Sequence, residues 1–570
     1  MIGHLHHMPT KPSLRFHGLP ALWMILSGLM IPICGSGQFT DGMNVAFGKN
    51  RVQYRSFEWQ YFEQGVFEVY HYREGDQIAG QVSRILEEEA KALAPMFGRN
   101  IEGPIQVLVF KSQEEFRQSN VGIMTSQDEE TNIGGTARLV GSKMFLYGTG
   151  DRLTMQQDLR EGLARILFNQ AMYDSQWSEG LRSGNLVQVP EWMSEGIARY
   201  ASRQLDATSE NRILDACQTG AFKRLDQSTG LEAAVLGQAV WAYVADIYGM
   251  PTIANVLYMT RITRSIESGF RLATGFYLND LAAEVRAYHL RNAPREYQKL
   301  LPLLDNAKSR RVAQKSAGEV IPMRLRRRLE YTQFLPSPDG KHVAFTTNER
   351  GQLKVGTLEV ESGKCTWHTT LGHRLARIEN DRNPSLAWHP QGRTLAFATE
   401  LRGAPHLGLV SMSTGDVQMR ELFKMDQVLH MRFSPNGAFL LMSALEDGQS
   451  DLYRYDVVAN NHQPLWRDRF DDLQPAFWGQ GGAFIFASNR PDDTLRNDRL
   501  DHPFPTNLDL YVGNLNEDPV TLTRWTNTPD VDERLPQPLS QNEFIYLRND
   551  DEMNTPLGLG WRDSSIVAID

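Results

Sequence analysis

The sequence predicts a multidomain chain in which an α+β domain is followed by an all-β propeller. The first observation is the length of 570 residues, because single hydrophobic cores rarely grow beyond about 250–300 residues. The second is the order of patterns before residue 295, where strand-like alternation comes first and helical spacing follows. The third is a turn-and-strand signal that recurs after residue 329, as is typical of propeller blades.

The predicted α+β domain covers residues 38–295. Alternating aromatic and polar residues predict a β-hairpin within Phe39–Gly75, and helical spacing of apolar residues predicts a helix over Asp76–Met96. Pro104–Phe110 is typical of a buried strand, and Gly134–Tyr147 predicts a strand pair. Later helical patterns cover Leu159–Leu167, Ala233–Ala245, Ile253–Met259 and Leu281–Leu290, and Asp174–Asn185 predicts a loop.

Two stretches of the helical part carry motifs. They read LREGLAR from Leu159 and VPEWMSEGIARY from Val189. Trp192, Glu195 and Gly196 form a W-x-x-E-G pattern that is similar to the peptidase MA-like family. Gluzincin members of that family bind zinc through H-E-x-x-H on one helix and through the glutamate of W-x-x-E-G on another. The resemblance therefore implies a zincin-like fold for this domain.

The zinc-ligand positions that the resemblance implies are altered. Glu161 lies where the family has its general base, but the flanking ligand positions carry Arg160 and Ala164. A guanidinium has no lone pair for a metal, and a methyl group cannot coordinate one. No histidine occurs between His71 and His289. We expect a pseudo-peptidase with no catalytic residue, no metal and no cofactor, and interpret four positions as vestigial: Arg160, Glu161, Ala164 and Glu195.

Two interpretations of the glutamates stay open. Glu161 and Glu195 each lie four residues before an arginine, Arg165 and Arg199, so ordinary i,i+4 ion pairs on solvated helix faces explain them. Alternatively, the degenerate cleft binds a peptide without cutting it, and an arginine there suits an acidic or C-terminal carboxylate. The binding residues under this hypothesis are Arg160, Trp192 and Glu195.

The second half contains a repeat. Turn signals start at Ser337, His389, Ser434, Trp478 and, more weakly, Ser540, at spacings of 52, 45, 44 and 62 residues. Each precedes a short apolar stretch: HVAFTT, TLAFAT, FLLMSA, AFIFAS and EFIYLR. A unit of about 45 residues with four strands is a propeller blade. Residues 329–570 are therefore predicted to form an incomplete propeller with four full blades and part of a fifth.

The amino-acid sequence of the blades resembles that of a known family. The run SPDGKHVAFTTNERG from Ser337 and the run SNRPDD from Ser488 are similar to blades of TolB, a propeller of the bacterial periplasm. A peptidase MA-like domain followed by such a propeller resembles the envelope family called TolB-like translocation proteins. TolB-type propellers have six blades, which is more than this sequence supplies. The resemblance implies a location in the cell envelope and binding of a protein or peptide partner.

The N-terminus predicts export. A basic start, an apolar run over Leu19–Ile33 and small residues before Gln38 predict a signal peptide over residues 1–37, cleaved near Gly37. A lipoprotein at Cys34 is disfavoured because the isoleucine before it is large. No later segment is apolar enough to cross a bilayer. We expect a periplasmic or secreted protein, with peripheral association with the outer membrane as a further expectation.

Charge and cysteine content restrict the partners. A net charge of −9 argues against nucleic acid, and the basic stretch over residues 296–328 is typical of a solvated linker. Cys217 and Cys365 fall in different predicted domains, so a structural disulfide is not expected. An acidic stretch suits calcium chemically but lacks a known loop spacing, so a solvated insertion is favoured: Asp492, Asp493, Asp498 and Asp501.

These observations favour an exported, non-catalytic protein-binding scaffold of the cell envelope. The first alternative is a hydrolase, a peptidase with residual or metal-independent activity through Glu161 and Glu195. The second alternative is a glycan-binding propeller that uses aromatic side chains at its rim.

Overall fold

The computed structural model describes residues 52–119, 138–140, 143–173, 188–203, 205, 207–293, 330–349, 352–372, 384–479, 482–493, 507–528, 531–538, 544–549 and 565–569. Below, residues 52–293 are the α+β half and residues 330–569 are the propeller half. The predicted signal peptide (residues 1–37, with Cys34), the predicted loop at residues 174–185, the predicted basic linker (residues 296–328), and Asp498, Asp501 and Ser540 lie outside the described residues. Within the described part of the chain, no helix is long and apolar enough to cross a membrane.

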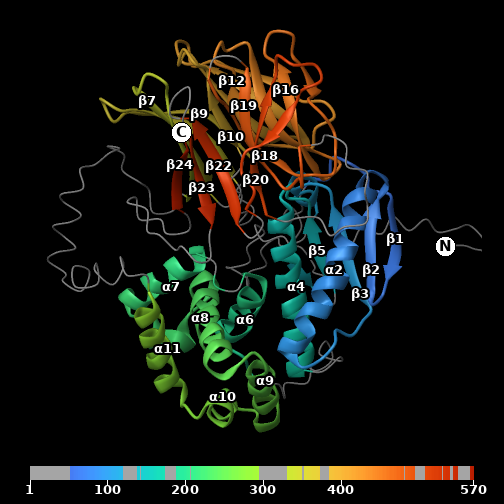
Figure 1. Cartoon of the computed structure of the whole chain (residues 1–570), viewed down its shortest axis with the longest axis vertical. Helices are drawn as coiled ribbons and strands as arrows, with labels where there is room; N and C mark the ends of the chain where they lie inside the picture. Colours follow the sequence, from blue (N-terminus) through green and yellow to red (C-terminus); the bar gives the residue numbers. More distant parts are fainter. Residues whose placement is uncertain are drawn as a thin grey trace, which may run out of the picture. The chain divides into compact units, whose positions relative to one another are not determined.

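The α+β half is built on a mixed five-stranded sheet of order β1-β2-β3-β5-β4 (Figure 1). Its strands are β1 (Trp59–Gln64), β2 (Phe67–Tyr72), β3 (Ile105–Phe110), β5 (Lys143–Tyr147) and β4 (Arg138–Val140). β1 with β2 and β4 with β5 are antiparallel, whereas β2, β3 and β5 run parallel. The predicted hairpin, buried strand and strand pair are thereby confirmed.

Helices supply the rest of this half. They are α2 (Asp76–Phe97), α3 (Gln113–Phe116), α4 (Arg152–Tyr173), α6 (Glu191–Arg203), α7 (Ala207–Thr219), α8 (Gly230–Tyr248), α9 (Pro251–Thr263), α10 (Ile266–Thr274) and α11 (Leu278–Asn292), with 3-10 turns η1 (Arg73–Gly75) and η2 (Ala221–Gln227). α2 crosses between the parallel strands β2 and β3 and lies against the sheet beside α4 (Figure 1). The predicted helices α2, α4, α6, α8, α9 and α11 are confirmed, whereas α3, α7 and α10 were not anticipated.

One hydrophobic core joins sheet and helices in this half. It includes Val69 and Val107 from the sheet, Leu86 from α2, Leu163 from α4 and Trp241 from α8, all fully buried. Burying a large apolar side chain contributes about 1.5–3 kcal/mol. The faces of α4 and α6 that do not enter this core carry the candidate site.

The propeller half consists of successive antiparallel sheets. Four have four strands, in the orders β6-β7-β8-β9, β10-β11-β12-β13, β14-β15-β16-β17 and β18-β19-β20-β21, and one has three, β22-β23-β24. The strands are β6 (Glu330–Pro336), β7 (His342–Glu349), β8 (Gln352–Glu359), β9 (Cys365–Leu371), β10 (Ser385–Trp388), β11 (Thr394–Leu401), β12 (Ala404–Ser411), β13 (Val417–Glu421), β14 (Gln427–Phe433), β15 (Phe439–Glu446), β16 (Gln449–Asp456), β17 (Asn461–Pro464), β18 (Asp472–Phe477), β19 (Ala483–Ser488), β20 (Asp509–Asn514), β21 (Leu522–Arg524), β22 (Asp532–Pro538), β23 (Phe544–Asn549) and β24 (Ser565–Ile569).

The first strands of these sheets stand next to one another in chain order, β6 by β10, β10 by β14, β14 by β18 and β18 by β22. Apolar clusters fill the spaces between neighbouring sheets, for example Leu386 and Phe397 against Val355. Successive meanders with adjacent first strands are the architecture of a β-propeller. The five apolar stretches predicted as strands correspond to β7, β11, β15, β19 and β23.

The repeated turn signal has a local cause. In the first sheet the Ser337 hydroxyl donates to the Asp339 carboxylate at 2.6 Å, and the His342 N–H donates back to the Ser337 hydroxyl at 2.9 Å. Gly340 occupies the left-handed region with φ 68°, which glycine adopts at little cost. Ser434 of the third sheet repeats this network. A Ser-Pro-Asp/Asn-Gly tetrapeptide thus closes the hairpin between the first two strands of a sheet.

Candidate functional site

The centre of the candidate site is an arginine between two glutamates. Arg165 Nη2 lies 2.5 Å from Glu161 Oε1 on the same helix, α4, and 2.7 Å from Glu195 Oε2 on α6. Arg165 Nε also donates to Glu195 at 3.2 Å. The side chains of Arg165, Glu161 and Glu195 are 26, 23 and 36% exposed. The guanidinium therefore bridges the two carboxylates that the family resemblance assigns to catalysis and to metal binding.

The electrostatics of this bridge favour a charged Glu161. Burial alone would raise the pKa of Glu161, but Arg165, and then Arg203 and Arg199, outweigh burial and lower it below its ordinary value. Burial would likewise lower the pKa of Arg165, but Glu195 and Glu161 outweigh it and raise it. A glutamate whose pKa is lowered stays ionised near neutral pH. It is therefore poorly matched to the proton transfers of a general acid or base.

Arg160 and Ala164, at the positions that the resemblance aligns with zinc ligands, are both held by contacts within the fold. Arg160 Nη1 lies 2.5 Å from Glu89 Oε2 on α2, and Arg160 Nε donates to the Ala201 carbonyl at 3.0 Å. Ala164 is completely buried in the hydrophobic core. Arg160 therefore links three helices, and the guanidinium predicted for ligand binding is engaged within the fold.

The W-x-x-E-G motif divides into a packing part and a charged part. Trp192 is completely buried and its indole N–H donates to Asp226 at 3.0 Å, so this side chain packs within the core. Gly196 permits close contact of α6 with α8, because a Cβ there would lie 2.3 Å from the Cα of Gly237. Of the motif, only Glu195 reaches the charged site.

One predicted ion pair is wrong. Glu195 was expected to pair with Arg199 on its own helix, but it pairs with Arg165 of the neighbouring helix. Arg199 instead donates to the Gln238 side chain at 2.8 Å. The other predicted pair, Glu161 with Arg165, is confirmed. Both carboxylates are partly buried between helices rather than freely solvated.

Asp158 also belongs to this site, although neither sequence motif includes it. It lies on α4 three residues before Glu161, the spacing that places two side chains on one helix face. Burial raises the pKa of Asp158 to about 7, although Arg203, whose Nη2 is 3.7 Å away, opposes this rise. The site thus holds three carboxylates, of which Asp158 titrates near neutrality.

A buried lysine connects the two halves. Lys111 lies at the end of β3, and its ammonium is 2.9 Å from Asp426 and 3.4 Å from Asp447 of the propeller half. It also lies 3.2 Å from Glu74. The lysine side chain is only 6% exposed. Burial alone would lower the pKa of Lys111, but Asp426 and Glu115 outweigh it and raise it.

A second ionic contact has the opposite polarity. Asp151 of the α+β half receives two hydrogen bonds from the Arg534 guanidinium of the propeller half, at 2.5 and 3.2 Å. Beside it, the Arg152 backbone N–H donates to Asp471 at 2.7 Å. Bidentate arginine–carboxylate contacts fix geometry as well as energy. Two contacts of opposite polarity therefore specify one docking of the halves.

Close packing accompanies these ion pairs. Gly150 has φ 70°, and a Cβ there would lie 2.7 Å from Leu429 and 2.8 Å from Leu445 of the propeller half. The Gly150 carbonyl accepts a hydrogen bond from the Ser450 hydroxyl at 2.6 Å. A side chain at position 150 would therefore separate the halves.

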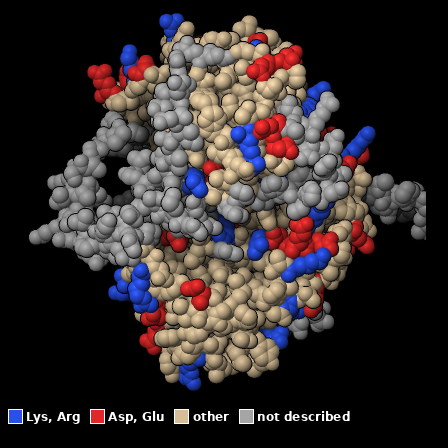
Figure 2. Space-filling view, in the orientation of Figure 1, with Lys and Arg blue, Asp and Glu red and all other residues tan. Residues whose placement is uncertain are grey.

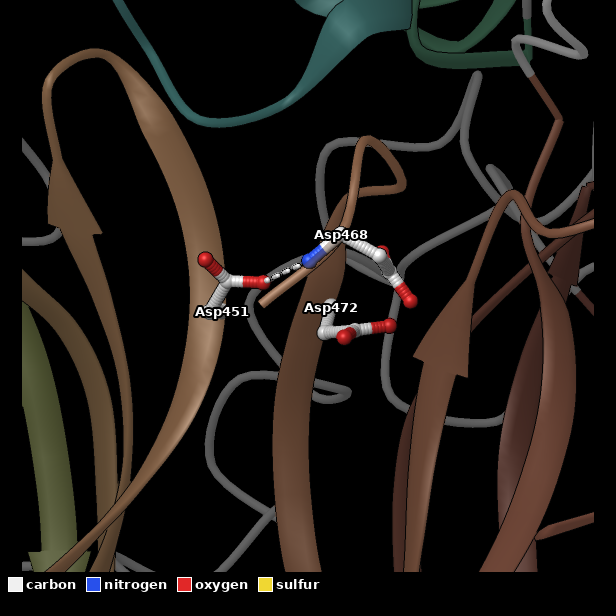
Figure 3. A group of neighbouring side chains, drawn as sticks. All are labelled: Asp451, Asp468 and Asp472. Carbon is white, nitrogen blue, oxygen red and sulfur yellow. Dashed lines mark hydrogen bonds between the residues drawn. The ribbon is translucent and has the colours of Figure 1, made fainter. Parts of the chain in front are cut away.

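A group of three aspartates is the one described cluster that has the spacing of a metal site. Asp451, Asp468 and Asp472 each place one oxygen within 4.8 Å of the others (Figure 3). The Arg490 guanidinium lies 2.8 Å from Asp472 and 3.1 Å from Asp468, and its side chain is fully buried. Burial, and then Asp472 and Asp468, raise the pKa of Asp451 well above its ordinary value. Arginine thus supplies the positive charge here, and the cluster alone does not indicate a metal.

The remaining candidate features are the acidic stretch considered for calcium, the two cysteines and the surface charge. Of the acidic stretch considered for calcium, Asp493 accepts a hydrogen bond from the Arg524 backbone N–H at 2.5 Å, while Asp498 and Asp501 lie outside the described residues. Cys217 is buried, Cys365 is exposed, and both are free thiols. On the face shown in Figure 2, acidic and basic side chains are interspersed rather than gathered by sign.

No protein-family model matches this sequence. No curated protein matches it either. Among solved structures, the chain is similar to TolB from Acinetobacter baumannii, with 14% identity and a TM-score of 0.28 over 39% of this chain and 52% of that one. It is also similar to a TolB-type protein from Agrobacterium tumefaciens (19% identity, TM-score 0.30, 40% of this chain and 73% of that one). A third match is the Cps50 (Swd1) β-propeller domain of Myceliophthora thermophila (14% identity, TM-score 0.29, 40% and 64%).

The match spans about half the length of the Acinetobacter TolB. It covers about two fifths of the present chain. The propeller architecture itself follows from the strand order of the five sheets.

Proposed function

We propose that this protein is an exported, non-catalytic scaffold of the bacterial cell envelope that binds a protein partner. In this proposal the α+β half is a pseudo-peptidase of zincin-like ancestry and the propeller half supplies the binding surface. The observation that carries the proposal is the position of Arg165 between Glu161 and Glu195. It provides within the chain the positive charge that a metal would provide in an active relative.

The chemistry of the site supports the absence of peptidase activity. A zinc peptidase needs imidazole or thiolate ligands and an open coordination position for water. Here one flanking position is a buried methyl group, and the other is an arginine held by Glu89 and a backbone carbonyl. The metal-free hydrolase considered as an alternative would act through Glu161 and Glu195. Arg165 pairs with both carboxylates and lowers the pKa of Glu161, which makes Glu161 poorly matched to proton transfer near pH 7.

The joint between the halves supports a scaffold role. Lys111 and Arg534 form ion pairs across it in opposite directions, and Gly150 allows close approach of the backbones. Rigid presentation of loops and turns favours binding, because little entropy is lost when a partner docks. A propeller held firmly by a second domain is suited to such presentation.

Site-specific photo-crosslinking in the source organism tests the proposal. A photoreactive amino acid is placed at Gln391 or Ala438, which are exposed on turns of the propeller, and at the exposed Arg212 of α7 for comparison. We expect one protein adduct of defined size from the propeller positions, equally abundant when Glu161→Gln is present. Adducts with glycan only, or protein adducts lost in Glu161→Gln together with peptide cleavage by the wild type, would support the alternatives instead.

A further inference from the structure

The α+β half contacts one end of the propeller. This end, here called the loop end, carries the loops between the second and third strands of each sheet and the loops that lead to the first strand of the next sheet. The contacts come from four successive sheets, through Glu400 with Arg117, Asp426 with Lys111, Asp471 with Arg152, and Arg534 with Asp151. The opposite end, here called the turn end, carries the turns at Ser337, His389, Ser434 and Trp478. These four contacts between the halves all lie at the loop end and leave the turn end free of them.

Arg432 lies at the turn end of a first strand. β14 begins at Gln427, next to the contact made by Asp426, and ends at Phe433, one residue after Arg432. In the same way β22 passes from Arg534, which contacts Asp151, to Gln537 near its far end. Arg432 and Gln537 are therefore both near the mouth opposite the α+β half.

These two side chains meet across the centre of the propeller. Arg432 Nη2 donates to Gln537 Oε1 at 3.1 Å. β14 belongs to the third sheet and β22 to the fifth, and β18 of the fourth sheet stands between them. Side chains from sheets two apart can reach each other only on the inner side of the ring. Arg432 therefore marks the axis, where a partner entering the turn end would arrive.

Arg432 has a neutral hydrogen-bond partner and no carboxylate partner in the described part of the chain. Among the described residues, no carboxylate lies within ion-pair distance of its guanidinium, and its hydrogen-bond partner is a neutral amide. Its side chain is partly exposed, and burial lowers its pKa. By contrast, Arg490 and Arg534 of the same half each contact two aspartates. A partly exposed guanidinium without an anion favours a ligand that brings one.

We propose that the turn end of the propeller axis binds a carboxylate group of a protein partner, with Arg432 as the residue that recognises it and Gln537 as the group that orients its guanidinium. This inference rests on the proposed scaffold function and specifies its binding end and its chemistry. A guanidinium can hold a carboxylate through two parallel N–H donors, which selects acidic side chains or a free C-terminus over amides.

A photoreactive hexaglutamate peptide tests this inference on the full chain. Hexaglutamine with an amidated C-terminus and the same label is the probe without a carboxylate. Labelled positions are mapped by mass spectrometry in the wild type, in Arg432→Gln and in Arg432→Lys. The matched control is Arg454→Gln, which makes the same change on an exposed position of the same sheet, where the arginine stacks over Phe439. Mapping also separates specific labelling from attraction to the basic residues 296–328.

We expect hexaglutamate to label the turns near Gln391 and Ala438, with about tenfold or greater loss in Arg432→Gln, partial retention in Arg432→Lys and no change in Arg454→Gln. Labelling confined to residues 296–328, equal labelling by both peptides, or no effect of Arg432→Gln would overturn the inference. If partner adducts in the envelope persist undiminished in Arg432→Gln, the inference fails while the scaffold function stands. If no protein adduct forms at all, the scaffold function itself fails.

Discussion

Replacing Arg165 with methionine tests the electrostatic bridge in the α+β half. The substitution keeps a long apolar side chain but removes the guanidinium from between Glu161 and Glu195. Three charge-assisted hydrogen bonds are lost at once, of 2.5, 2.7 and 3.2 Å. Two partly buried carboxylates would then face each other without the guanidinium that bridges them.

The expected loss lies between two reference cases. Breaking a fully buried pair costs about 3–5 kcal/mol, whereas an exposed pair contributes about 0–1 kcal/mol. The three side chains are 26, 23 and 36% exposed, so we expect a loss of about 2 kcal/mol at pH 7.5. The double variant Glu161→Gln, Arg165→Met should recover about half of that loss, because it leaves one carboxylate instead of two.

The loss should also depend on pH. Arg165 lowers the pKa of Glu161 in the folded state, so its stabilising contribution is present above the unfolded value of about 4.3 and is lost as the pH falls through the folded value. Urea unfolding followed by circular dichroism at 222 nm reports on this half, because every described helix lies in it. Arg212→Met on the exposed face of α7 is the matched control.

An Arg165→Met variant as stable as the wild type at pH 7.5 would refute the reasoning. So would a loss that stays the same as the pH falls from 7.5 to well below 4, since the ion pair must weaken when Glu161 takes up a proton in the folded state.

Three further predictions concern packing, titration and domain docking. Gly237→Ala should unfold or strongly destabilise the α+β half, because its Cβ would lie 1.7 Å from the Trp192 carbonyl, whereas Gly80→Ala, with open space in α2, should stabilise it by about 0.5–1 kcal/mol. Equal effects in thermal melts would contradict this. Asp158→Asn should add on the order of 1–2 kcal/mol at pH 8 and almost nothing at pH 4. Burial raises the pKa of Asp158 to about 7, so the protonated side chain favours folding below pH 4 and this contribution is lost as the pH rises through 7. An equal gain in stability at pH 4 and at pH 8 would contradict this explanation. Lys111→Met should weaken docking of the halves by about 3 kcal/mol, since Asp426 loses its buried partner. Small-angle X-ray scattering should then give a larger radius of gyration. An unchanged scattering profile would argue against a role of Lys111 in docking the halves.

Local sequence patterns predicted the parts of the fold that depend on neighbours in the chain. The strands β1, β2 and β3 and the helix α2 follow from alternation and helical spacing. The turns at Ser337 and Ser434 follow from side chains that bond their own backbone. α7 and α10 were missed because one has a polar composition and the other has only nine residues.

The contacts that define the site depend on residues far apart in the chain. The partner of Glu195 is 30 residues away on another helix, and an i,i+4 rule therefore selected Arg199 instead. Lys111 meets Asp447 across a separation of 336 residues, and Arg534 meets Asp151 across 383. No local periodicity encodes such pairs, so the joint between the halves could not be predicted. That Arg160 and Ala164 cannot bind zinc could be predicted, because it depends only on residue identity.

The most direct test of the pseudo-peptidase account is the metal content of the purified mature chain, measured by elemental analysis together with a broad peptide-cleavage screen. The positive charge between Glu161 and Glu195 belongs to Arg165, so we expect zinc far below one ion per chain and no cleavage above background. One zinc ion per chain, with cleavage abolished by a chelator and restored by zinc, would contradict the account.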